Sequence, residues 1–487
     1  MSESLAVEKA LKMISAEVLH GYVRELASER FGGRLSGTPE YRAAAEWAAG
    51  QFLRWGVVPG GNGGTFLQAF PNPYTLILPG GGLTLHGDAR KGTGEKRCAY
   101  EADYFPGGTT ASGRVTAEVV YAGFGVTAPA LGYDDYAGVD VRGKIVLLDA
   151  EVPVASEIEK GFDPAVFPPW RPYSFHSAKL DNAIAHGAAG ALYGCGAFFM
   201  PNAVYRPGFV YSTIGPTVVD DLFSGTGRDH DEEVAAIRRD LKPRSFALGR
   251  TVTLDNRSRH HPEGIGYNVI GLIPGSEPAL REEALLIGGH LDHCGRAWEL
   301  LPGANDDASA VAVILGIAEA FFRSGLRPRR TIVLALFGGE EQGFLGSEFY
   351  CAHPRLPLDR IAAMINLDLV GCGEGIFAYA GKNFPELWAF FEEANRSFVG
   401  RPLATCVVAN LMRPRLDGMI FAARGVPVVS FALVGADGTS PGSHTTHDTA
   451  EAITPGPMAD LSRLIFAAAA AMSGRDRLNF RVQGERP

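Results

Sequence analysis

The chain has 487 residues and a formal net charge of −9 at pH 7, with 46% hydrophobic and 20% charged residues. These proportions are ordinary for a soluble globular protein, and the length is enough for more than one domain with a full hydrophobic core. An acidic chain without a dense basic run is not expected to bind nucleic acid.

Cysteine spacing and apolar runs bear on the environment of the chain. The six cysteines have no CxxC spacing, so they indicate neither a disulfide framework nor a thiolate zinc site. Residues 1–19 lack the continuous apolar core of a signal peptide, and apolar runs such as 464–472 are too short to span a bilayer. We expect no membrane span and a cytoplasmic protein, or a secreted or periplasmic one if a leader has been removed; the oligomeric state stays open.

The chain begins with a helical segment and continues into a turn-rich region. Apolar residues at helical spacing over 18–55 predict two helices separated by a turn at 32–39. From about residue 72 to 253, short apolar runs such as 115–121 and 144–148 alternate with turn residues and predict strands.

Two segments of this second region resemble the protease-associated domain: YDDYAGVDVRGKIV at 133–146, and 179–190, which ends in HGAAG. That resemblance implies a β-rich insert that shapes substrate access and carries no chemistry. His176 and His186 are therefore interpreted as structural. The expected organisation is a catalytic domain formed by residues 1–71 and 254–487, with a protease-associated domain inserted at 72–253.

The second part of the chain has the pattern of a parallel sheet. Residues 284–287 and 331–337 read as buried strands, and 308–322 between them has the length and composition of a helix. The strand–helix–strand order is typical of parallel pairing. Two more apolar strands follow, at 364–367 and 426–433.

Polar residues that can bind metal gather at the ends of these elements. They are His290 and Asp292, Asp306 and Asp307, Glu340 and Glu341, then Asp368 and His444. Open α/β sheets build their sites at the carboxyl ends of strands, and zinc accepts both imidazole and carboxylate. Two histidines and three carboxylates hold two dications if one carboxylate bridges, and one added hydroxide balances the +4 charge.

In their order along the chain, these motifs resemble the co-catalytic dizinc metallopeptidases, which include bacterial leucyl-type aminopeptidases and glutamate carboxypeptidases. The resemblance covers nearly the whole chain outside the insert. It implies an α/β fold of the zinc-peptidase phosphorylase/hydrolase-like kind, in which a mixed, mostly parallel sheet is flanked by helices. It also implies two zinc ions, which cobalt or manganese can replace.

The resemblance also assigns roles. His290 and Asp368 bind one ion, Asp306 bridges both, and Glu341 and His444 bind the other. The family's general base, which takes a proton from the attacking water and delivers it to the leaving amine, corresponds to Glu340. Asp292 is expected to accept the second ring N–H of His290. Asp307 is expected to follow a cis peptide bond.

Other residues compete for these roles. The family pattern favours His290 and His444, so His293 and His447 are interpreted as loop residues or as neighbours of the ligands. Cys294 is interpreted as a bystander, because a thiolate would change the oxygen and nitrogen ligand set. Ser440 lies in a G-x-S-x-G segment, but a nucleophile elbow needs a helix directly after the serine, and a loop is expected there.

The segment before the last strand differs from the family pattern. Arg413 and Arg415 could bind a substrate carboxylate bidentately, but a surface role is favoured. Residues 415–418 read RLDG where many relatives have Ser-Asp-His or Ser-Asp-Tyr, so Asp417 is kept and the ring is missing.

We interpret the sequence as a metallopeptidase acting on peptide substrates. An aminopeptidase that releases N-terminal residues is favoured, because no strong carboxylate-binding signature stands out. The alternatives are a carboxypeptidase or amidohydrolase acting on acylated or acidic dipeptides, and a non-catalytic receptor-like protein, which should have lost ligands or the base. The full five-ligand set disfavours a single-zinc glutaminyl cyclase.

Overall fold

The computed structural model describes residues 3–87, 94–156, 159–202, 204–408, 416–435 and 442–480. The chain divides into two compact units. The first comprises Met1–Tyr74, Pro262–Gly295 and Leu300–Pro487, and the second comprises Thr75–His261 and the short segment Arg296–Glu299. The boundaries between the two units thus lie after Tyr74 and after His261, whereas the sequence predicted them after residues 71 and 253. The return of the chain to the second unit at 296–299 had not been expected.

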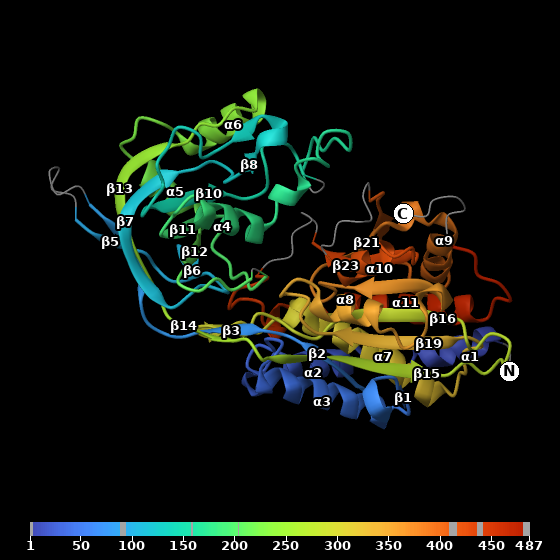
Figure 1. Ribbon diagram of the computed structural model, residues 1–487. Coiled ribbons are helices and arrows are strands. Elements are labelled where there is room, and N and C mark those ends of the chain that lie inside the picture. Colours follow the sequence, from blue (N-terminus) through green and yellow to red (C-terminus); the bar gives the residue numbers. More distant parts are fainter. Residues whose placement is uncertain are drawn as a thin grey trace. The chain divides into compact units, whose positions relative to one another are not determined.

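The first unit is organised around a nine-stranded sheet in the described part of the chain. Its strands are β1 (Val58–Pro59), β2 (Leu67–Pro71), β15 (Ile265–Ile273), β16 (Ala284–His290), β19 (Thr331–Phe337), β20 (Ile361–Leu367), β21 (Gly375–Tyr379), β22 (Leu403–Thr405) and β23 (Val428–Val434). The order is β1-β15-β19-β16-β20-β23-β21-β22, and β2 also pairs with β15 (Figure 1). The central strands β19, β16, β20 and β23 are parallel, whereas β15 and β21 join them antiparallel.

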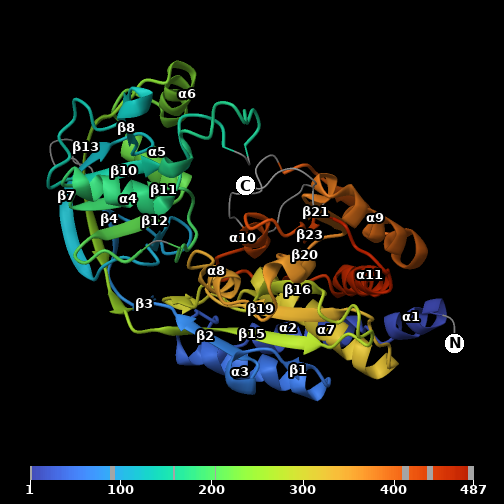
Figure 2. The ribbon, with the colours of Figure 1, turned by 45° about the vertical axis from the view of Figure 1, so that its right-hand side comes forward.

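Helices cover both faces of this sheet, which confirms the expected α/β class. One face packs against α1 (Glu3–Leu11), α2 (Ala16–Leu26), α3 (Pro39–Arg54), α7 (Ser309–Ser324), α9 (Pro385–Ala394) and α11 (Pro455–Ser473). The other face packs against α8 (Leu345–Ala352) and α10 (Asp417–Ala422) (Figure 2). Every residue of β16 and β19 is buried, because alternate side chains enter the two layers: Ile287 enters the first and Leu286 the second.

Helix α7 connects β16 to β19 and lies at the centre of the first layer. It packs against α2 and α11, so its residues are buried on nearly every side. The approach to α2 is close: a Cβ at Gly316 would lie 2.5 Å from Cδ2 of Leu19. Gly325, with φ of +71°, ends the helix in the left-handed conformation that favours glycine. The buried helix fixes the turn before it, which carries Asp306.

The second unit is a separate β-rich body. Its eight-stranded sheet, in the described residues, runs in the order β5-β4-β13-β7-β10-β11-β12-β6. These strands are β4 (Gly82–His86), β5 (Lys96–Arg97), β6 (Tyr104–Pro106), β7 (Gly113–Tyr121), β10 (Ile145–Asp149), β11 (Gly190–Gly194), β12 (Val210–Ile214) and β13 (Phe246–Asn256). Smaller sheets are formed by β8 (Thr127–Ala128) with β9 (Tyr133–Asp134), and by β14 (Ser258–His261), β3 (Tyr74–Ile77), β17 (Arg296–Ala297) and β18 (Glu299–Leu300).

The helices of the second unit are α4 (His176–Ala185), α5 (Pro216–Phe223) and α6 (His230–Asp240). His176 Nδ1 lies 2.7 Å from the hydroxyl of Tyr193, and the ring of His186 stacks on Tyr136 with centroids 4.1 Å apart. Both histidines therefore pack within this unit. In the described residues of the whole chain, no helix has the length and apolar character needed to cross a membrane.

Candidate metal centre

The expected site residues gather at one edge of the main sheet, where its parallel strands end. His290 is the last residue of β16, Asp368 directly follows β20, and Glu340 and Glu341 follow β19. His444 lies in the loop after β23. Parallel strands present their carboxyl ends at the same edge, so residues distant in sequence meet there.

Asp306 lies at the centre of this group. Its Oδ1 is 3.2 Å from Nε2 of His290, and its Oδ2 is 3.3 Å from Nε2 of His444. Ser443 Oγ donates a hydrogen bond to the same Oδ2 at 2.6 Å. The peptide bond between Asp306 and Asp307 is cis, as the family resemblance implied. One carboxylate thus faces two histidines on opposite sides.

The first group of donors surrounds His290. Its Nε2 lies 4.0 Å from Oδ1 of Asp368 and 3.8 Å from Oδ2 of Asp307. Asp307 Oδ2 also accepts a hydrogen bond from the backbone N–H of His290 at 3.2 Å. His290, Asp307 and Asp368 bring ligand atoms close enough to surround a single cation.

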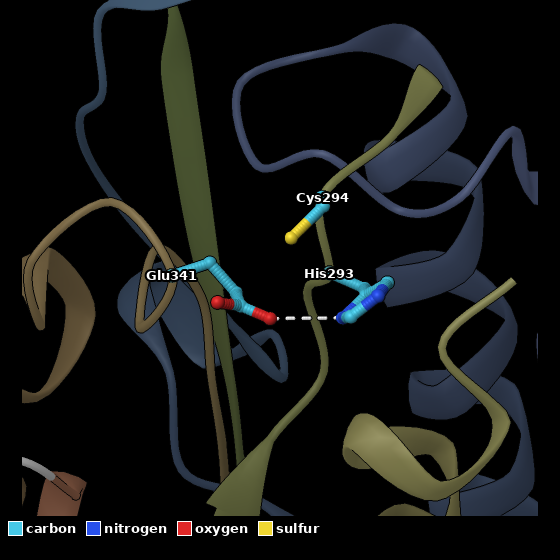
Figure 3. Close-up of side chains that lie close together, drawn as sticks. All are labelled: His293, Cys294 and Glu341. Carbon is cyan, nitrogen blue, oxygen red and sulfur yellow. Dashed lines mark ion pairs between the residues drawn. The ribbon is translucent and has the colours of Figure 1, made fainter. Parts of the chain in front are cut away.

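The second group surrounds Glu341. Its Oε2 is 3.0 Å from Nε2 of His444, and its Oε1 is 2.8 Å from Nδ1 of His293. Figure 3 shows His293 and Cys294 beside this carboxylate. Asp306, Glu341 and His444 form one candidate ligand group, and His293, Cys294 and Glu341 form another. Both residues therefore lie directly at the cluster, His293 as one of the neighbours of the ligands that the sequence allowed and Cys294 where only a bystander had been expected.

Asp292 contacts the centre through both its backbone and its carboxylate. Its carboxylate lies 3.7 Å from Nδ1 of His290, whose hydrogen bond goes to the backbone carbonyl of Asp292 at 3.2 Å. The two carboxylate oxygens accept hydrogen bonds from the backbone N–H groups of Glu340 and Glu341, at 3.2 and 3.3 Å. Asp292 thus fixes the backbone of the Glu340–Glu341 pair.

Burial and crowded charge shift the pKa values of the site. Burial raises the pKa of Asp368 to about 8 and, together with neighbouring carboxylates, raises that of Glu340 well above its usual value. Burial also acts to raise the pKa of Glu341, but His444 and His293 together outweigh it and lower that pKa to about 2. Burial acts to lower the pKa of His290, yet Asp307 and Glu340 raise it well above the usual value. The site has a strong excess of negative charge.

The unpaired donors in this cluster fit metal ions. Both ring nitrogens of His293 and the Oε1 of Glu341 are buried without an aligned hydrogen-bond partner in the described part of the chain, although the two groups are in contact. Buried polar atoms without partners are costly, and a cation between them removes that cost. Imidazole and carboxylate donors are the ligands that zinc accepts. The residues present therefore fit dications bound on both sides of Asp306.

Sequence reasoning missed one important support, the fully buried Arg34. Its guanidinium donates hydrogen bonds of 2.7–2.8 Å to the backbone carbonyls of Leu26, Leu291, Pro302 and Gly303. Arg34 thus ties the loop after β16 to the turn that carries Asp306. In the sequence, Arg34 is visible only as an arginine in a glycine-rich turn, and this pattern does not predict which carbonyl groups it contacts.

Several other candidates can now be placed. His447 is exposed, whereas His444, three residues earlier, lies at the cluster. Asp417 begins α10 and is buried, and burial raises its pKa to about 7. Arg413, Arg415 and Ser440 lie outside the described residues.

The protein thus has an α/β fold, and buried histidines and carboxylates gather at the edge of its parallel strands. Such a group of side chains is typical of a metal-binding site. The sequence model of "Peptidase family M28" matches residues 268–469 of this chain. The match includes His290, Asp306, Glu341, Asp368 and His444. The resemblance to the co-catalytic zinc peptidases is thereby confirmed.

Individual relatives agree with this assignment. Leupeptin-inactivating enzyme 1 of Streptomyces exfoliatus is 32% identical over 141 residues, 28% of this chain and 30% of its own length. Carboxypeptidase Q of Xenopus laevis is 29% identical over 202 residues, 40% of this chain and 37% of its own length. The matched stretch is therefore well under half of these curated relatives. The structure of the aminopeptidase from Aneurinibacillus sp. strain AM-1 aligns over 98% of both chains with a TM-score of 0.64 and 21% identity, which shows a common fold.

Proposed function

We propose that this protein is a zinc-dependent aminopeptidase that releases N-terminal residues from peptides and binds two zinc ions at this centre. The observation that most directly supports this proposal is that the two oxygens of Asp306 face two histidines, His290 and His444, at 3.2 and 3.3 Å. One carboxylate placed in this way can bridge two cations. The donors on either side, Asp368 and Glu341, give each cation a further ligand.

Different residues of the chain have different roles in the proposed hydrolysis. Two dications, when bound, lower the pKa of water from about 15.7 toward 7 and stabilise negative charge on the scissile carbonyl oxygen. Glu340 is the general base: it takes a proton from the attacking water and delivers it to the leaving amine. Its pKa is raised by burial and by neighbouring carboxylates, which suits a group that must accept and then return a proton near neutral pH. Asp292 fixes its position through the backbone.

The charge of the site supports an N-terminal specificity. A free peptide N-terminus is a cation, and the centre has buried carboxyl groups beyond those of the five-ligand set, among them Asp292, Asp307 and Asp417. Arg34, which lies at the turn of Asp306, is buried and its guanidinium is directed at backbone carbonyls. An ammonium group gains more from these surroundings than a second carboxylate does.

The test uses purified, zinc-loaded protein. Aminoacyl anilides should be cleaved, and Glu340→Gln should lower kcat by at least about a hundredfold, because general-base catalysis contributes roughly 10²–10⁴-fold. Elemental analysis should find two zinc ions per chain in wild type and variant alike. The matched control is Glu348→Gln, which removes a half-exposed carboxylate paired with Arg424 and should leave activity unchanged. Full activity of Glu340→Gln, or no cleavage of any amide by the loaded wild type, would refute the proposal.

A carboxypeptidase or amidohydrolase is the second candidate, favoured by the similarity to the protein named carboxypeptidase Q. N-acyl dipeptides, which have no free N-terminus, separate the two activities. Cleavage of N-acyl dipeptides in preference to aminoacyl anilides would replace the aminopeptidase assignment while keeping the roles of Asp306 and Glu340. A non-catalytic receptor-like protein would cleave neither substrate.

A further inference from the structure

Glu340, the proposed general base, has no hydrogen bond that fixes its own carboxylate. Within the described residues, only its backbone groups form hydrogen bonds, and its N–H donates to Asp292 at 3.2 Å. The direction of the carboxylate therefore depends on the backbone of the loop 338–344, which connects β19 to α8 (Figure 1). A general base must lie within hydrogen-bond reach of the proton that it accepts, so the position of this loop bears directly on the proposed reaction.

The loop 338–344 has a conformation that needs support from outside. Gly339 and Gly343 have φ values of +67° and +99°, and Phe344 has a φ of +63°. The left-handed region is unfavourable for a residue such as phenylalanine, and it is kept only where the surrounding structure holds it. We therefore looked for the contacts that hold the loop in place.

The two ends of the loop and its first residues are held from within the catalytic unit. Asn268 of β15 is fully buried, its Oδ1 accepts the N–H of Gly338 at 3.1 Å, and its Nδ2 donates to the carbonyl of Gly346 at 2.8 Å. Asp292 accepts the N–H groups of Glu340 and of the next residue. These contacts do not reach the segment after Glu341.

The side chain of Gln342 supplies the contact that this segment would otherwise lack. Its Nε2 donates to the carbonyl of Pro73 at 3.1 Å, and its Oε1 accepts a hydrogen bond from Nδ2 of Asn72 at 3.0 Å. Asn72 is fully buried, and its backbone N–H donates to the carbonyl of Gly264 at 2.8 Å. A Cβ at Gly264 would lie 2.2 Å from the carbonyl oxygen of Asn72, so the packing there is tight. Gln342 is thus bonded to a well-fixed segment outside its own loop.

We propose that Gln342 is a positioning residue that sets the direction of the Glu340 carboxylate. Asp292 holds the chain at Glu340, and the two hydrogen bonds of Gln342 hold it again two residues later. The backbone between these points cannot turn freely while both are in place. A misplacement of about 1 Å can cost roughly a hundredfold in rate. This inference rests on the proposed function, in which Glu340 is the general base.

The neighbouring metal ligand, Glu341, depends less on this contact. Its two carboxylate oxygens face His293 and His444 at 2.8 and 3.0 Å, so its side chain has partners of its own. Loss of the Gln342 hydrogen bonds should therefore impair proton transfer by Glu340 and leave metal binding intact.

Steady-state kinetics and metal content test this division. Gln342→Met keeps the length of the side chain and removes both hydrogen bonds. It should lower kcat by about ten- to a hundredfold, change KM by less than about threefold, and still bind two zinc ions per chain. The matched control is Gln51→Met, because Gln51 is a half-buried glutamine of α3 whose Oε1 has no hydrogen-bond partner among the described residues. Gln51→Met should have the kinetic constants of wild type.

A double-mutant cycle tests whether Gln342 acts through Asn72. Asn72→Asp replaces the donated N–H by an oxygen, so one of the two hydrogen bonds is lost and kcat should fall. Asn72→Asp combined with Gln342→Met should be slower than Gln342→Met alone by less than about twofold, because the same contact cannot be lost twice. Independent, multiplicative losses of kcat would overturn the role of this pair.

Hydrogen exchange of the metal-free protein gives a readout that needs no activity. Amides of the loop 338–344 should exchange at least about tenfold faster in Gln342→Met than in wild type or Gln51→Met. Wild-type kcat in Gln342→Met, or a loss of zinc together with kcat, would overturn the proposal, and a wild type that cleaves peptides would still support the proposed function. A loaded wild type that cleaves no amide would refute the proposed function and, with it, this role of Gln342.

Discussion

The carboxylate of Asp448 accepts a hydrogen bond at 3.0 Å from the backbone N–H of Asp306, which lies 142 residues earlier in the chain. Its other oxygen accepts the N–H of Asn305 at 2.7 Å, and its backbone carbonyl accepts the N–H of Ala304 at 3.1 Å. Asp448 lies four residues after His444. The loop that presents His444 thus also holds the turn that presents the central carboxylate.

This relationship predicts that Asp448→Asn weakens metal binding without removing a ligand. Asparagine keeps one acceptor and turns a donor toward the other N–H, so the turn of Asp306 loses one of its supports. Loss of such an outer contact typically costs 10–100-fold in metal affinity, which competition with a chromophoric chelator measures. The control, Asp460→Asn, removes a carboxylate of α11 that pairs with Arg401 and Arg463 away from the turn. Equal zinc affinities of wild type and Asp448→Asn would contradict the prediction.

Arg34 is predicted to be essential for stability. Arg34→Met leaves four carbonyl groups without their donor, three of them in buried hydrogen bonds, and hydrogen bonds to a charged group are worth about 1.5–3 kcal/mol each. We expect a loss of at least about 3 kcal/mol in the free energy of unfolding, measured with urea. Arg42→Met removes an exposed pair with Glu46 within α3 and should cost only about 0.3–0.5 kcal/mol. Similar losses in the two variants would show that the buried hydrogen bonds contribute little.

Removing the metal should make stability depend on pH. In the metal-free protein, burial raises the pKa of Asp368 to about 8, whereas an unfolded chain has about 3.9. The folded state therefore holds more protons between these values, and the free energy of unfolding falls as pH rises through about 8. His290 acts in the same direction, because its raised pKa makes it lose a proton at higher pH than in the unfolded chain.

Thermal unfolding at pH 6, 7 and 8, with and without a chelator, measures this effect. The Tm of the chelated protein should fall with rising pH, and the difference from the zinc-loaded protein should widen. The slope has an upper bound of about 1.4 kcal/mol per pH unit for each group that titrates. A constant difference between loaded and chelated protein would contradict the prediction.

A second pH dependence is predicted in the insert unit, at Asp135. Burial raises its pKa to about 7, although its oxygens accept hydrogen bonds from the Tyr133 hydroxyl at 2.7 Å and the Val126 N–H at 3.0 Å. The folded state thus keeps a proton that the unfolded chain has already lost, so stability contributed by this group falls as pH rises from about 4 to 7. Urea midpoints of the insert transition should decline over this range in wild type and much less in Asp135→Asn. The exposed carboxylate of Asp140 is the control, since Asp140→Asn should keep the wild-type decline.

Much of the fold could be read from the sequence because its signals are local. The strand expected at 331–337 is β19 itself, and the helix expected at 308–322 is α7 to within a residue or two. Continuous apolar runs, a glycine at the end of the helix and polar residues after each strand are all visible without partners. The short strands β17 and β18 were missed, because two residues have no periodicity and their pairing with β3 is decided far away in the chain.

The sequence by itself determined which residue types could bind metal and in what order they occur: His290, Asp306, Glu341, Asp368 and His444. Only the tertiary structure decided what surrounds them. It turned the carboxylate of Asp292 to the backbone of Glu340 and Glu341, and it put Arg34 beneath the turn of Asp306. It also placed His293 against Glu341. Residue type fixes which ligand atoms are available, but the direction of a buried side chain depends on packing and hydrogen bonds between segments that meet only in the folded chain.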